Sequence, residues 1–134
     1  MKKRIIILLV CTLIIGVLLV LLFINNKEND ILNNTSVIIV KTANDDGSFN
    51  ENKITNTNNI SRIIEIIDDK KEISFEEVPY RKMPHYKLSF LDKKDSVIME
   101  VGFFYYSENL NWIMINDNKE YYEIDSKALL ELIR

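Results

Sequence analysis

The chain has one cysteine, one histidine and three glycines in 134 residues, and these shortages exclude several kinds of site. Three glycines leave no glycine-rich loop to bind phosphate groups. The single His85 has neither a second imidazole nor a nearby cysteine, so neither a histidine-based metal site nor a Cys–His nucleophile is available. We therefore predict no catalytic residues, no bound metal and no cofactor, and a protein that is not an enzyme.

Charge is absent from residues 5–24, where only Cys11, Thr12 and Gly16 interrupt a run of Ile, Leu, Val and Phe. A helix of about 20 residues spans roughly 30 Å, which is the thickness of the hydrocarbon core of a bilayer. The run is longer than the core of a secretory signal, and no small residues for a cleavage site follow it. The sequence thus predicts a transmembrane helix whose partner is the lipid bilayer. A lipoprotein role for Cys11 is disfavoured, because Val10 precedes it.

The flanks of this run predict its orientation. Lys2, Lys3 and Arg4 precede it, and the positive-inside rule keeps such residues in the cytoplasm. We expect a single-pass protein of the cell membrane with a cytoplasmic stub (1–4), an anchor (5–24), a polar stalk (25–35) and an extracytoplasmic domain (36–134). The only cysteine lies in the anchor, so the outer domain has no disulfide.

The outer part of the chain is mildly acidic. Three of the 17 Lys and Arg residues and none of the 20 Asp and Glu residues precede residue 25, which leaves about −6 for the remainder. Nucleic acid would need a basic patch, so we predict no nucleic-acid partner.

Hydrophobic periodicity predicts an α+β fold. Residues 37–40 read as a β-branched strand, 49–55 as a weaker strand, and Ile60, Ile63, Ile64 and Ile67 as the apolar stripe of a helix with candidate N-caps at residues 57–59. Alternating residues then predict four or five strands, followed by a short helix behind Asp125 and Ser126. The expected domain is a mainly antiparallel sheet covered by two helices.

Short motifs accompany this order of elements. They include Val40-Lys41-Thr42, Gly47-Ser48-Phe49, Pro84-His85-Tyr86, Tyr121-Tyr122-Glu123-Ile124 and Leu129-Leu130-Glu131-Leu132-Ile133. With these motifs, the chain resembles the YhfM-like family of small membrane- or lipid-anchored extracytoplasmic domains of low-GC Gram-positive bacteria. The chain departs from the family where a plain span replaces a lipoprotein signal. The resemblance implies this fold and location and no particular activity.

Aromatic residues concentrate in the later strands, where half of them must point away from the core. One interpretation is that they merely have high strand propensity. The other is an exposed patch for an envelope protein or glycan, because Tyr and Trp give large, rigid contact surfaces. Alternation cannot assign the two faces, since both sets are apolar around Phe103 and Phe104. The candidate binding residues are Tyr105, Tyr106, Trp112 and Tyr122.

Two functions remain open at this point. The first is a non-catalytic binding or interaction module in the cell envelope, which a flat aromatic sheet face would favour. The alternative is a membrane-tethered enzyme or small-ligand receptor acting on cell-wall material. A pocket with converging acids near Glu76, Glu77 and His85 would favour the alternative.

Overall fold

The computed structural model describes residues 10–21, 33–74, 83–116 and 120–134, and the chain divides into two units, Met1–Asn33 and Asn34–Arg134. In the first unit, residues 10–21 are helical, and their large apolar side chains are half or more exposed. Within the described ranges, no helix combines the length and the apolar character needed to cross a membrane.

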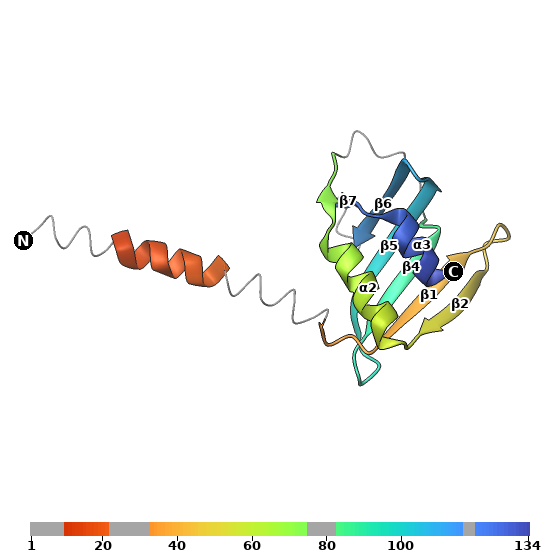
Figure 1. Ribbon diagram of the computed structural model, residues 1–134, viewed down its shortest axis with the longest axis horizontal. Helices are drawn as coiled ribbons and strands as arrows, with labels where there is room; N and C mark the ends of the chain where they lie inside the picture. The colour runs from red at the N-terminus through yellow and green to blue at the C-terminus, as the bar shows by residue number, and fades with distance from the viewer. Residues whose placement is uncertain (1–9, 22–32, 75–82, 117–119) are drawn as a thin grey trace, which may run out of the picture. The chain divides into compact units, whose positions relative to one another are not determined.

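The second unit is an α+β domain with a single antiparallel sheet (Figure 1). In chain order its elements are β1 (Val37–Ala43), β2 (Phe49–Ile54), α2 (Thr57–Asp68), β3 (Lys71–Glu72), β4 (Tyr86–Leu91), β5 (Val97–Ser107), β6 (Leu110–Ile115), β7 (Tyr121–Glu123) and α3 (Ser126–Ile133). The spatial order of the strands is β2-β1-β4-β5-β6-β7-β3. The predicted fold class is confirmed for this unit, with one short strand, β3, that the sequence did not predict.

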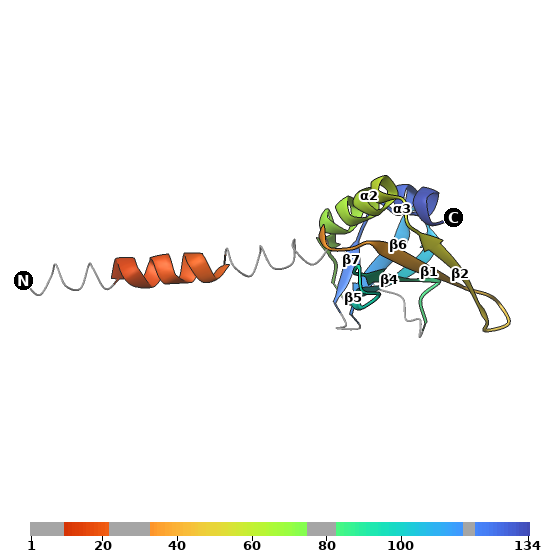
Figure 2. The ribbon, with the colours of Figure 1, turned by 90° about the horizontal axis from the view of Figure 1, so that it is seen from below.

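Helix α2 crosses the sheet from one edge to the other. It begins directly after edge strand β2 and leads into β3, which lies at the opposite edge. Both helices lie on the same side of the sheet, as Figure 2 shows in side view. We call this side the covered face and the other side the open face.

The core lies between the covered face and the helices. Ile60, Ile63 and Ile67 of α2 are buried there, as the periodicity predicted, while Ile64 is half-buried. The sheet contributes a continuous set of buried side chains across four strands, namely Ile38, Val40, Leu88, Phe90, Val101, Phe103 and Ile113. Burial of this set supplies the main driving force for folding, since every large member would otherwise expose apolar surface to water.

The helix caps explain where both helices begin. The predicted caps of α2 at residues 57–59 are wrong by one residue or more. The Asn56 side chain accepts hydrogen bonds from the amides of Asn58 and Asn59 at 2.9 and 3.2 Å. For α3 the predicted cap is confirmed, because the Asp125 carboxylate accepts from the amide of Ala128 at 3.0 Å. In both cases a short polar side chain satisfies amides that have no partner inside the helix.

Candidate functional site

The pairing of β5 with β6 decides which aromatic rings share a face. Phe104 lies opposite Trp112, and the next pair, Phe103 and Ile113, points to the other side. Phe103 stacks on Tyr86, and Tyr86 Oη accepts a hydrogen bond from Arg134, which follows α3. Phe103 therefore belongs to the covered face. Phe104 and Trp112 belong to the open face.

On the open face, four rings form a continuous array that we call the aromatic stack: Phe104, Trp112, Tyr106 and His85. Trp112 is sandwiched between Phe104 (centroid distance 5.5 Å, interplanar angle 13°) and Tyr106 (5.5 Å, 26°). The His85 and Tyr106 rings form a T-shaped contact with 5.1 Å between their centroids. Such offset and edge-to-face contacts add to the stabilisation that burial alone provides.

Exposure changes sharply along the aromatic stack. Phe104 and Trp112 are 3% and 2% exposed, whereas Tyr106 is 44% exposed. Gly102 lies beside the buried end of the stack, where a Cβ would come within 3.4 Å of the Pro84 ring and 3.6 Å of the Phe104 ring. The stack thus has a buried base, formed by Phe104 and Trp112, and a solvent-exposed member, Tyr106.

Trp112 carries a buried polar atom without a partner. Within the described structure, its Nε1 makes no hydrogen bond although the side chain is buried. An unpaired buried donor costs about 1–3 kcal/mol. Packing between two aromatic rings, rather than hydrogen bonding, therefore holds the indole in place.

His85 is tied into the sheet through its backbone and one ring nitrogen. Its amide donates to Phe103 O at 3.0 Å, and its carbonyl accepts from Ala43 N at 2.9 Å. Its Nδ1 accepts from the amide of Tyr105 at 3.1 Å, so this nitrogen is already engaged and unprotonated. This position suits a structural role better than general-base or metal-ligand chemistry.

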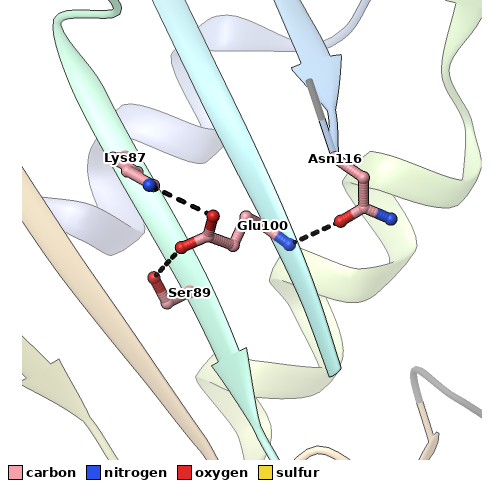
Figure 3. Close-up of polar contacts among 4 residues, drawn as sticks. All are labelled: Lys87, Ser89, Glu100 and Asn116. Atoms are coloured by element: carbon pink, nitrogen blue, oxygen red, sulfur yellow. Dashed lines mark hydrogen bonds and ion pairs between the residues drawn. The ribbon is translucent and has the colours of Figure 1, made fainter. Parts of the chain in front are cut away.

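The rest of the open face carries charged and polar groups (Figure 3). The carboxylate of Glu100 on β5 lies 3.1 Å from Lys87 Nζ and accepts from Ser89 Oγ at 3.3 Å, both on β4. Asn116 closes the network, since its Oδ1 accepts from the Glu100 amide at 2.9 Å. Lys87 and Glu100 are half-exposed, Ser89 is buried, and Asn116 is exposed. The open face therefore has an aromatic part and a polar part side by side on β4, β5 and β6.

Tyr105 lies on the covered face, away from the aromatic stack. The centroid of its ring lies 5.9 Å from that of Phe103. Tyr105 also lines a shallow groove of about 280 Å³ beside α3, together with Glu108, Lys127, Leu130, Glu131 and Arg134. A hydrogen bond to Tyr86 raises the pKa of the Arg134 guanidinium above its ordinary value, so its charge is permanent.

Tyr122 is separate from the other candidates. It pairs with Ile113 across the β6–β7 ladder and so belongs to the covered face. Lys70 Nζ lies 5.5 Å from the centre of its ring, in cation–π geometry, and its hydroxyl donates to Glu120 at 2.7 Å.

Of the four predicted binding residues, the structure therefore brings two together and separates two. Tyr106 and Trp112 share the aromatic stack, but Trp112 is buried and offers no ring face to solvent. Tyr105 and Tyr122 lie on the covered face. Sequence reasoning missed Phe104 and His85 as members of the stack. The register of the β5–β6 hairpin would have identified Phe104 as a member, because it places Phe104 opposite Trp112.

A second concavity lies at the other end of the helices. It measures about 450 Å³ and is lined by Asp69, Lys71, Glu123, Ile124 and Asp125. Asp125 already caps α3, so its carboxylate is in use. No three His, Cys, Asp or Glu side chains in the described ranges are arranged to hold a metal ion. Glu76 and Glu77 lie outside the described residues.

Comparison with known proteins gives no match: no family model, no curated protein and no solved structure is significantly similar to this chain.

Proposed function

We propose that the chain is a single-pass, membrane-anchored extracytoplasmic protein whose α+β domain is a non-catalytic binding module of the cell envelope. In this proposal residues 5–24 hold it in the bilayer, and the open face of the sheet contacts an envelope protein or glycan. The observation that carries the binding role is the aromatic stack, whose buried base reaches solvent through Tyr106.

The anchor is supported by the apolar side chains of residues 10–21. Val10, Leu13 and Leu19 are among nine large apolar residues that are 52–70% exposed, and the exposed positions include the consecutive residues 13–15 and 17–21. Consecutive apolar positions cover every side of a helix, which has no polar face to turn toward water. Lipid is the solvent that suits such a surface.

The binding role is supported by the contrast inside the aromatic stack. A half-exposed tyrosine on a buried Trp–Phe base is rigid, so it loses little side-chain entropy when a partner covers it. Tyrosine is also enriched among the residues that dominate binding energy at interfaces. Lys87 and Glu100, which are both half-exposed on the same face, provide a donor and an acceptor for the polar rim of such a contact.

Protease protection tests the topology. Protease added to intact protoplasts should digest the domain beyond residue 25, while the same domain is protected if it lies inside. A mature protein that starts near residue 25, or at an acylated Cys11, would refute the anchor.

Site-specific photocrosslinking tests the binding face. A photoreactive phenylalanine analogue placed at Tyr106 of the full-length protein in native membranes should capture a discrete partner. Val97, which is 57% exposed at the start of β5, provides a matched control in another part of the sheet. Equal capture from both positions, or none from Tyr106, would rule out the aromatic stack as the contact surface.

A further inference from the structure

Strand β2 forms an edge of the sheet. It pairs with β1 on one side, and no described strand pairs with its other side. Its residues Phe49 to Lys53 are exposed, and Ile54 is buried. An edge strand presents unpaired amides and carbonyls that another chain can use.

The hydrogen bonds of the β1–β2 hairpin identify which groups point outward. Asn44 donates its amide to Ser48 O at 2.9 Å, so Asn44 and Ser48 form a hydrogen-bonded pair. Such pairs alternate along an antiparallel ladder, and the β1–β2 register continues it with Asn50 and Asn52 bonded to β1. The amides and carbonyls of Phe49, Glu51 and Lys53 therefore point away from β1.

The same three residues place their side chains on the open face. Glu51 lies opposite Lys41, with 3.7 Å between Glu51 Oε2 and Lys41 Nζ. Lys41 and Lys87 each pair with a glutamate, whereas Lys53 has no carboxylate partner in the described part of the chain. One strand thus carries an acid and an unmatched base two residues apart, both beside outward backbone groups.

This spacing makes β2 complementary to β2 of a second copy of the chain. When two copies of β2 pair antiparallel about a two-fold axis, residues opposite each other lie on the same face. The register centred on Asn52 sets Glu51 of each copy opposite Lys53 of the other, twice. It also pairs outward backbone groups with outward backbone groups. Centring the axis on Glu51 or Lys53 would instead oppose two like charges, which is unfavourable.

We propose that β2 is a homodimerisation edge, and that two copies of this chain pair antiparallel through β2 with Asn52 on the two-fold axis. The sheet then runs continuously through both copies, with the helices of both on the same side. Each Glu51 lies between Lys41 of its own chain and Lys53 of the partner. A lysine on an edge strand often prevents such pairing. Here the acid two residues away converts the same lysine into a recognition element.

Single-cysteine crosslinking tests the register. In a non-hydrogen-bonded antiparallel pair, opposite Cα atoms lie about 4.5 Å apart, within the range of about 4.4–6.8 Å that a disulfide requires. Full-length protein carrying Cys11→Ser and Asn52→Cys should therefore form a reducible dimer in membranes under mild oxidation. Asn50→Cys is the matched control, because its copies lie about 13 Å apart along the strands in this register. We expect at least tenfold more dimer from Asn52→Cys. Equal yields, or no dimer from a folded and maleimide-reactive Asn52→Cys protein, would overturn the proposal.

Charge exchange tests the recognition element in the same crosslinking background. Lys53→Glu should lower the dimer yield at least fivefold, because it opposes two acids. Reversing all three charges, with Lys41→Glu, Glu51→Lys and Lys53→Glu together, should restore most of the yield, because it reverses the pair within each chain as well as the pairs between the chains. Lys93→Glu, in the exposed β4–β5 turn, makes the same change of net charge and should have no effect. If the exchange fails to restore a dimer that Lys53→Glu abolished, the Asn52-centred register is wrong.

Discussion

The two faces of the sheet bury aromatic rings in different ways. On the covered face Phe103 is fully buried with Leu88, Val101 and Ile113 beneath the helices. On the open face, Phe104 and Trp112 are almost as buried, but Trp112 also stacks on the exposed Tyr106. Burial alone therefore does not separate core from candidate binding surface. The useful distinction is whether a buried ring stacks on an exposed one.

Truncating the covered face should have the largest effect. Phe103→Ala removes a fully buried ring and should lower the free energy of unfolding by about 3–5 kcal/mol. Chemical denaturation of the isolated domain, starting near Ser36, measures this loss. A change below about 1 kcal/mol would mean that the helices do not pack on this face.

The buried base of the open face should be more tolerant of a conservative change. Trp112→Phe loses packing area, but it also removes an Nε1–H that has no partner among the described residues. We expect a loss of less than about 1.5 kcal/mol, because the removed unpaired donor offsets part of the cavity cost. A loss as large as that of Phe103→Ala would show that the indole nitrogen is bonded in solution.

The polar part of the open face should contribute less. Glu100→Gln removes the charge facing Lys87 while keeping a similar shape, and both side chains are partly exposed. Solvent screening limits the expected loss to about 0–1 kcal/mol, and the loss should shrink as salt is added. Urea unfolding at low and high ionic strength measures both effects. Asp45→Asn, in the exposed β1–β2 turn, is a control that changes the net charge by the same amount. A salt-independent loss would contradict an exposed ion pair.

Tyr106→Ala should change stability modestly and binding most. The ring is 44% exposed but covers one face of Trp112, so we expect a loss in unfolding free energy of about 1 kcal/mol, alongside loss of the partner captured in membranes. Thermal melting and partner capture, measured on the same variant, separate the two roles. A fall of more than about 15 °C in melting temperature would place Tyr106 in the core and direct the search for a binding surface elsewhere.

Local patterns were sufficient for most elements of the α+β domain but not for its faces. The isoleucine stripe of α2 and the Asp125 cap follow from short-range rules, and both are present. The aromatic faces could not be assigned because apolar residues occupy both parities around Phe103 and Phe104. Only the pairing of distant strands, such as Phe104 with Trp112, resolves them. Likewise, β3 is two residues long, too short to leave a periodic signal.

The chain contains one tryptophan, and its position gives the domain an internal optical reporter. Because Trp112 is buried between Phe104 and Tyr106, its fluorescence should be blue-shifted in the folded state and move to longer wavelength when water reaches the indole. A ligand that binds to Tyr106 changes the surroundings of the indole, because Tyr106 covers one of its faces. Unfolding and occupancy of the open face can therefore both be followed by emission from one residue, without any added label.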